Sequence, residues 1–89
     1  MVMPAAILLV RPRGDGGPAR VGFTVTRKLG KAVIRNRIKR RLRALARELL
    51  PTAGVPGADH VLIGRAEALD RPFADMRAEL ARALGRMAQ

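Results

Sequence analysis

Three short segments of the chain have the spacing of β-strands. Residues 5–10 form an uninterrupted apolar run, which predicts a strand with both faces covered. Residues 20–26 alternate strictly between apolar side chains and polar or small ones, a pattern typical of a strand with one open face. The turn-forming residues 13–18 between them predict a hairpin loop. Residues 60–64 form another apolar run and predict a third strand.

Two longer segments have the spacing of amphipathic helices. Residues 32–50 place five aliphatic side chains within an arc of about 80°, so this helix should lie with one stripe on the sheet. The stripe consists of Ile34, Ile38, Leu42, Leu45 and Leu49. Pro51 and the glycines after it predict the end of the helix. Residues 73–87 repeat apolar side chains in the same way, with Asp70 as the expected N-cap and Pro72 in the first turn.

The order of these elements is β-β-α-β-α. It predicts the α/β class, as a small two-layer α-β sandwich. A chain of 89 residues is too short for two hydrophobic cores, so residues 1–89 are expected to form a single domain.

The charge of the chain is strongly positive. Its 18 Lys and Arg residues face only 7 Asp and Glu, which gives a formal net charge of +11. Such a chain repels itself unless a polyanion neutralises it, so nucleic acid is the first partner to consider. Residues 16–47 contain no acidic residue and hold most of the cations, which predicts one positive surface.

Four cations in the predicted helix of residues 32–50 lie four residues apart. They are Arg35, Lys39, Arg43 and Arg47, which we call the cationic ridge. Each step of four advances only about 40°, so the ridge can follow a phosphate track. Like charges at this spacing destabilise an isolated helix by about 0.2–0.5 kcal/mol per pair, which favours a bound polyanion as the reason for the pattern. The flanks of the ridge, which could hold a second nucleic-acid strand, carry Arg37, Arg40 and Arg41.

Four other residues have alternative interpretations. Asn36 falls among the ridge cations and could bind a base edge or a ribose hydroxyl, or orient neighbouring backbone. Phe23 fits either the core side of its strand, which we favour, or a stacking platform for a base. His60 is interpreted as a structural or sheet-edge residue rather than a general base. Gly30 is interpreted as a backbone bend rather than a phosphate cradle.

The sequence contains none of the usual catalytic or metal-binding patterns. Cysteine is absent and no carboxylates are paired at metal-ligand spacing, so the chain is not expected to cut bonds or bind a cofactor by itself. The lack of cysteine fits a reducing cytoplasm. No segment reaches the roughly 20 apolar residues that span a bilayer, so no membrane partner is expected.

Residues 27–43 carry the most specific motif of the chain. A basic pair, a glycine and Ala-Val precede an Arg-Asn-Arg triplet, and further cations follow it. This run resembles the signature of the bacterial ribonuclease P protein family. Residues 21–26 and 61–65 also resemble strands of that family, so the resemblance covers nearly the whole chain.

The resemblance implies both a fold and a function. The fold is an α-β sandwich in which the basic helix joins two parallel strands by a left-handed crossover, against the usual right-handed preference. The function is that of the protein subunit of the ribonuclease P ribonucleoprotein, an endonuclease that removes the 5′ leader from precursor tRNA. The RNA subunit would hold the catalytic Mg²⁺ ions and hydrolyse the phosphodiester. The protein would be a monomer in a 1:1 complex in the bacterial cytoplasm.

The resemblance also divides the polar side chains between two RNA partners. The catalytic RNA would be contacted by Arg27, Lys28, Lys31, Arg37 and Arg40. The cleft for the single-stranded leader would be lined by Thr24, Thr26, Arg35, Asn36, Lys39, Arg43 and Arg47.

The sequence departs from the family at its start. Family members usually begin with another helix and an extended segment with aromatic residues, whereas here the first predicted strand starts almost at Met1. We therefore expect part of the cleft wall to be missing. Either the sequence is truncated or assigned the wrong start, or leader binding relies on charge and on the threonine face of the second strand. Leu8 and Leu9 stand where an aromatic residue is common, which argues against base stacking there.

Two other functions are compatible with the cationic ridge. A ribosomal-type RNA-binding protein would use the ridge as a scaffold without any role in cleavage. A helix-turn-helix DNA-binding protein is a third interpretation, but the elements beside the basic helix are predicted to be strands.

Overall fold

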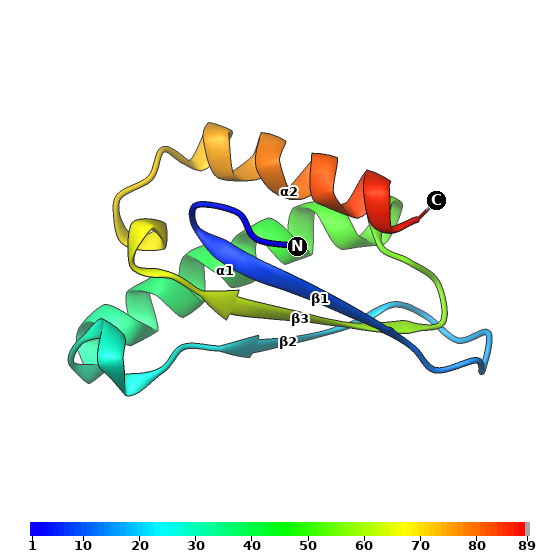
Figure 1. The fold of residues 1–89 in the computed structure, drawn as a ribbon, viewed down its shortest axis with the longest axis horizontal. Coiled ribbons are helices and arrows are strands. Elements are labelled where there is room, and N and C mark those ends of the chain that lie inside the picture. The colour runs from blue at the N-terminus through cyan, green and yellow to red at the C-terminus, as the bar shows by residue number, and fades with distance from the viewer. Residues whose placement is uncertain (89) are drawn as a thin grey trace.

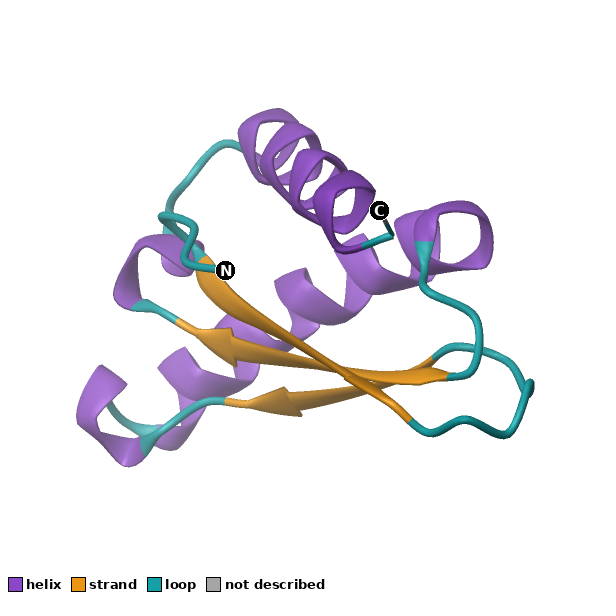
Figure 2. Cartoon of the chain, turned by 45° about the vertical axis from the view of Figure 1, so that its right-hand side comes forward, coloured by secondary structure: helices purple, strands orange, loops and turns teal. Residues whose placement is uncertain are grey.

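Three strands form one sheet, and two long helices cover one of its faces in the computed structural model, which describes residues 1–88 (Figures 1 and 2). The strands are β1 (Ala6–Pro12), β2 (Arg20–Thr24) and β3 (Ala58–Gly64), and the helices are α1 (Ala32–Ala53) and α2 (Phe73–Met87). Two short 3-10 helices that were not predicted precede the long ones: η1 (Arg27–Leu29) and η2 (Ala66–Leu69). The β-β-α-β-α order and the two-layer sandwich are confirmed. Gln89, the last residue of the expected domain, lies outside the described residues.

The strand β3 lies in the middle of the sheet, antiparallel to β1 and parallel to β2. The predicted hairpin between β1 and β2 is therefore wrong, because these strands do not pair with each other. The loop between them instead bonds to the segment before β3: Arg13 N–H donates to the Gly57 carbonyl (2.8 Å), and Gly57 N–H donates to the Gly17 carbonyl (2.7 Å). A turn signal reverses the chain but does not determine which strand it then pairs with.

The chain crosses from β2 to its parallel neighbour β3 through α1. In the view of Figure 1 both strands run from right to left, β3 lies above β2, and α1 passes behind the sheet. This arrangement makes the crossover left-handed, as the resemblance implied.

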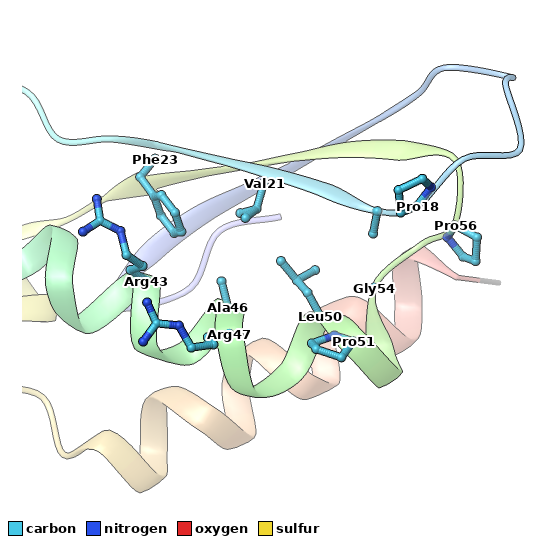
Figure 3. A pocket seen from close by; sticks show the side chains of 11 residues that line it. Pro18, Val21, Phe23, Arg43, Ala46, Arg47, Leu50, Pro51, Gly54 and Pro56 are labelled. Atoms are coloured by element: carbon cyan, nitrogen blue, oxygen red, sulfur yellow. The ribbon is translucent and has the colours of Figure 1, made fainter.

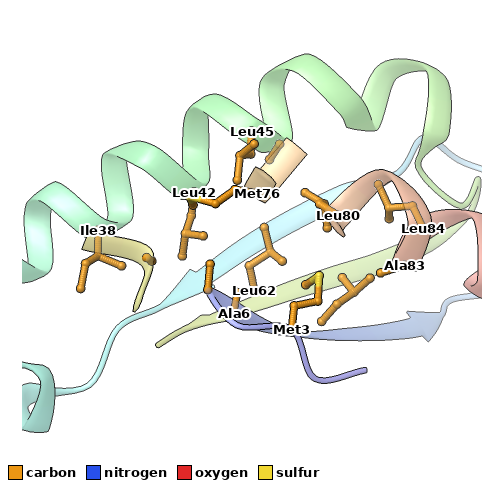
Figure 4. Packing of buried hydrophobic residues seen from close by; sticks show 14 residues of the cluster. Met3, Ala6, Ile38, Leu42, Leu45, Leu62, Met76, Leu80, Ala83 and Leu84 are labelled. Atoms are coloured by element: carbon orange, nitrogen blue, oxygen red, sulfur yellow. The ribbon is translucent and has the colours of Figure 1, made fainter. Parts of the chain in front are cut away.

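The core lies between the sheet and the two helices (Figure 4). Leu8 and Leu62 point inward from β1 and β3 and are almost fully buried. Leu9, the neighbour of Leu8, is 49% exposed, so the prediction that the first strand is covered on both faces is wrong. The reason is that both helices pack on the same face, which leaves the other face of the sheet open.

The aliphatic stripe of α1 faces the core as predicted. Ile38, Leu42 and Leu45 are buried, and Ile34 and Leu49 at the ends of the stripe are partly buried. The helix continues past the predicted end to Ala53, with Pro51 inside it. A proline in the last turn removes only one backbone hydrogen bond, and the N–H of Gly54 then closes the helix on the Leu50 carbonyl (3.0 Å).

His60 is buried in the central strand, only 1% exposed. Its Nε2 accepts a hydrogen bond from the Val55 N–H (3.0 Å), so its Nδ1 carries the proton and donates to the Arg20 carbonyl (3.0 Å). The structural role predicted for His60 is confirmed, whereas the sheet-edge position is wrong. The predicted strand also begins two residues earlier, at Ala58, and β2 ends at Thr24 rather than at residue 26.

The start of α2 differs from the prediction. Asp70 ends η2 instead of capping α2, and Pro72 takes the N-cap position. The guanidinium of Arg41 holds this segment by donating to the carbonyls of Ala68 and Arg71, each at 2.6 Å. Arg41 therefore faces η2, and its predicted place on a nucleic-acid-binding flank is wrong.

Candidate nucleic-acid interface

The cationic ridge lies on the side of α1 away from the buried stripe. Arg43 and Arg47 are exposed, and so are the nearby Asn36 and Arg40. Lys39 and Arg35 are half-buried. The helical period thus places the predicted cations on one continuous surface, as 3.6 residues per turn requires.

A second group of cations surrounds the N-terminus of α1. Arg27 and Lys28 in η1 and Lys31 at the N-cap are all exposed. Gly30 has a φ of 137°, a conformation open to glycine, which turns the chain from η1 into α1. The bend predicted at Gly30 is confirmed. Arg35 is partly committed to this bend, because its Nε donates to the Gly30 carbonyl (3.2 Å).

The electrostatics of this helix start are unfavourable in isolation. The first turn of α1 contains no acidic residue, and no side chain caps its free N–H groups. The positive end of the helix dipole then lies among positive side chains. A bound anion would relieve this repulsion.

Five of the seven acidic side chains form ion pairs with cations outside the ridge. The ion pairs are Arg13 with Asp15 (3.0 Å) and Asp59 (2.7 Å), Arg71 with Glu67 (3.8 Å) and Glu79, and Arg77 with Glu48 (2.9 Å). No ion pair within residues 1–88 includes a member of the cationic ridge. The charge of the ridge is therefore left for an external partner.

These ion pairs shift the pKa values of their members. The hydrogen bond from Arg13 is the main cause that lowers the pKa of the Asp15 carboxyl, with a smaller contribution from the Gly17 N–H. The hydrogen bond to Glu79 is the main cause that raises the pKa of Arg71. Both shifts stabilise the charged forms of side chains that lie outside the ridge.

An open groove of about 560 Å³ runs between β2 and the C-terminal half of α1 (Figure 3). Its lining includes Val21 and Phe23 from β2 and Arg43, Ala46, Arg47 and Leu50 from α1. The Arg43 guanidinium carbon lies 5.9 Å from the centroid of the Phe23 ring. Phe23 is partly buried and packs against the core, as we favoured, while it also lines the groove. Core packing of Phe23 is therefore confirmed, whereas its use as a stacking platform for a base stays a prediction.

A second open hollow lies over the N-terminal half of α1. It is lined by Val33, Asn36, Lys39, Arg40 and Arg43. Val33 is 71% exposed. It was not selected from the sequence as a surface residue, although its position outside the aliphatic stripe could have indicated this. Arg40, predicted to contact the catalytic RNA, here shares one hollow with three residues predicted to contact the leader. The division between two RNA partners therefore remains a prediction.

The two threonines of the predicted leader cleft lie apart from the groove. Thr24 is exposed and, by strand alternation, points to the face of the sheet opposite Phe23. Thr26 is exposed at the N-cap of η1. Sequence reasoning missed the groove itself, because it depends on how β2 and α1 lie side by side.

Metal-ligating side chains do not cluster in the part of the chain that the structure describes. Within residues 1–88, no three His, Cys, Asp or Glu side chains lie close enough together to hold a metal ion. No helix in the same range is both long and apolar enough to cross a membrane. The arrangement can bind a polyanion along α1 and can accommodate a flat apolar group in the groove.

Comparison with known proteins identifies the family. Residues 3–88 match the family model described as Ribonuclease P. The chain belongs to the ribonuclease P protein family. The ribonuclease P protein component of Erythrobacter litoralis is 49% identical over 83 residues, which are 93% of this chain and 68% of that protein. The corresponding protein of Ruegeria pomeroyi is 50% identical over 78 residues, which are 86% of this chain and 62% of that protein.

The fold comparison agrees with the ribonuclease P assignment. The solved structure of the RNase P protein from Thermotoga maritima matches with a TM-score of 0.81 and 32% sequence identity, and covers 97% of this chain and 80% of that one. The resemblance seen in the sequence is thereby confirmed. The chain spans roughly two thirds of its ribonuclease P relatives' lengths, 68% and 62% in the two cases above.

Proposed function

We propose that this chain acts as the protein subunit of the ribonuclease P ribonucleoprotein. It binds the catalytic RNA and the 5′ leader of precursor tRNA, and so supports endonucleolytic 5′ maturation of tRNA in the bacterial cytoplasm. The observation that carries the proposal is the cationic surface from η1 to the end of α1, whose ridge has no acidic partner within residues 1–88. Family membership supports ribonuclease P RNA as the RNA partner.

The chemistry of the surface suits binding rather than cleavage. Arginine forks grip phosphate oxygens bidentately, and lysine supplies a looser point charge. Hydrolysis is assigned to the RNA subunit and to the Mg²⁺ ions held there. The protein contributes charge neutralisation, which lets two polyanions, the catalytic RNA and precursor tRNA, approach each other.

The two RNA partners are proposed to contact different parts of this surface. The catalytic RNA is contacted by Arg27, Lys28, Lys31, Arg37 and Arg40. The leader is contacted by Thr24, Thr26, Arg35, Asn36, Lys39, Arg43 and Arg47. Support for the division is that Arg27, Lys28 and Lys31 cluster at one end of α1, whereas Arg43 and Arg47 border the groove. The protein acts as a monomer in a 1:1 complex.

A reconstitution experiment tests the proposal. The protein is added to a bacterial ribonuclease P RNA at low Mg²⁺ concentration, and removal of the leader from precursor tRNA is measured. We expect the protein to promote leader removal, because its cations replace part of the counterion charge that Mg²⁺ otherwise supplies. A correctly folded protein that binds RNA without any stimulation would instead indicate the ribosomal-type scaffold.

A further inference from the structure

The junction between η1 and α1 carries three of the cations proposed to contact the catalytic RNA. Arg27, Lys28 and Lys31 are all exposed here, at one end of the molecule (Figures 1 and 2). The positive end of the α1 dipole lies among them. Repulsion between these charges favours spreading of the segment, so a fixed arrangement of the cations depends on contacts with the rest of the fold.

Apolar contacts hold the two sides of this junction. Leu29 and Ile34 are partly buried and pack against the core. Between them, Gly30 has a φ of 137°, and a Cβ atom at this position would lie 3.2 Å from Cδ1 of Ile34. Glycine loses more conformational freedom on ordering than any other residue. The bend at Gly30 is therefore the part of the junction that most needs a further contact.

Arg35 supplies that contact from the first turns of α1. Its Nε donates to the Gly30 carbonyl at 3.2 Å. No side chain caps the start of η1 or of α1, so within residues 1–88 this is the one side-chain hydrogen bond to the backbone of the junction, residues 26–31. A hydrogen bond from a charged donor is stronger than one between neutral groups. The bend is thus held by a single side chain.

This hydrogen bond uses only part of the Arg35 guanidinium. The side chain is half-buried and forms no ion pair within residues 1–88, and the bond to Gly30 occupies Nε alone. A guanidinium is a planar fork of five N–H donors, so Nε can bond to the protein while the two terminal nitrogens serve a phosphate. A lysine at this position would keep the positive charge but has only one nitrogen for both tasks.

We infer that Arg35 is a positioning residue for the catalytic RNA: its Nε fixes the bend at Gly30 and, through this bend, the three cations of the junction. The inference rests on the proposed function, which assigns those cations to the catalytic RNA and Arg35 itself to the leader. Because the junction is ordered before RNA arrives, less entropy is lost on binding. Arg35 therefore acts on both RNA partners, on the leader by contact and on the catalytic RNA through Gly30.

Hydrogen exchange of the free protein tests the positioning without any RNA. The N–H groups of Leu29 and Gly30 report on the junction, because each donates to the carbonyl three residues earlier (3.1 and 3.2 Å). We expect both to exchange several-fold faster in Arg35→Lys than in wild type, since the bend opens more often. Arg82→Lys makes the same replacement on the exposed side of α2 and should change neither rate.

Binding to a bacterial ribonuclease P RNA alone tests the consequence for function. Precursor tRNA is left out, so the leader contact of Arg35 does not contribute. We expect Arg35→Lys to bind about fivefold more weakly at fixed salt, the size of effect that one hydrogen bond has, and Arg82→Lys to bind like wild type. In a Lys28→Ala background the effect of Arg35→Lys should shrink, because the bend then positions one cation fewer.

A second variant disturbs the same bend without changing any charge. Gly30→Ala places a Cβ against Ile34 at a φ that other residues rarely adopt, and it should reproduce the loss of affinity. Wild-type affinity in a folded Gly30→Ala would overturn the inference. Unchanged exchange in Arg35→Lys would overturn it too, as would losses that simply add in the Lys28→Ala background. In each case wild type would still stimulate the catalytic RNA, whereas failure of the proposed function would appear as loss of that stimulation.

Discussion

The arginines of this protein do three different things, and their neighbours decide which. Arg41 donates to the carbonyls of Ala68 and Arg71 and so holds the fold. Arg13 pairs with Asp15 and Asp59 and steadies a loop. Arg43 and Arg47 of the ridge, in contrast, form no ion pair within residues 1–88 and are left for an external partner. A guanidinium that contacts protein carbonyls cannot also bind phosphate at full strength.

Arg41→Ala is expected to lower the free energy of unfolding by about 2 kcal/mol, since hydrogen bonds to charged groups contribute about 1.5–3 kcal/mol. Urea unfolding measures this change. Arg40→Ala is the matched control, because Arg40 is the exposed neighbour in the same helix. The control should leave stability nearly unchanged and weaken RNA binding. Equal stability losses in the two variants would contradict the structural role of Arg41.

At the scale of elements, α1 combines a buried stripe with an unpaired cationic ridge. The stripe fixes the rotation of the helix on the sheet, and this rotation aims the ridge outward. The helix stays folded despite the repulsion along the ridge, because packing of the stripe supplies most of its stability. RNA binding at the ridge should therefore depend strongly on salt.

Arg43→Ala is expected to reduce the slope of log affinity for RNA against log salt by about one unit, because one phosphate contact and its released counterion are lost. Arg86→Ala removes the same charge from the exposed side of α2 and serves as the control. Binding titrations at several salt concentrations measure both slopes. A slope that stays the same in Arg43→Ala would place this residue outside the interface.

The loop between β1 and β2 should loosen in acid. Asp15 accepts hydrogen bonds from Arg13 Nε (3.0 Å) and Gly17 N–H (2.9 Å), which lower its pKa below that of the unfolded chain. The stability it contributes is present above the unfolded pKa and is lost as the pH falls through the folded pKa. Unfolding measured across the acid range should show a smaller pH dependence in Asp15→Asn than in wild type. Parallel curves would contradict this coupling.

At the scale of the whole molecule, a net charge of +11 on 89 residues sets the conditions for stability. The positive surface opposes the compact state through self-repulsion, and salt or RNA relieves it. Folding stability and RNA binding are therefore thermodynamically coupled.

We expect the melting temperature of the free protein to rise as salt increases from about 50 to 200 mM, because screening weakens the repulsion. The additional rise caused by RNA should shrink over the same range, because binding weakens with salt. Thermal unfolding with and without RNA measures both trends. A free protein whose melting temperature falls with salt would show that repulsion does not limit its stability.

The sequence by itself determined the three strands, the two long helices and the cationic ridge. The period of α1 and the alternation of β2 are local patterns, so Ile38 could be placed in the core and Arg43 on the surface without any tertiary information. The Arg-Asn-Arg motif identified the family for the same reason, since it is a contiguous run. The absence of acidic residues from positions 16–47 also predicted one positive surface.

Only the tertiary structure decided what depends on contacts between distant segments. The insertion of β3 between β1 and β2, the turn of Arg41 toward η2, and the groove beneath Phe23 each join residues far apart in the chain. Local propensity carries no information on such pairings, because the energy that selects them comes from packing and hydrogen bonds formed after the chain has folded back on itself.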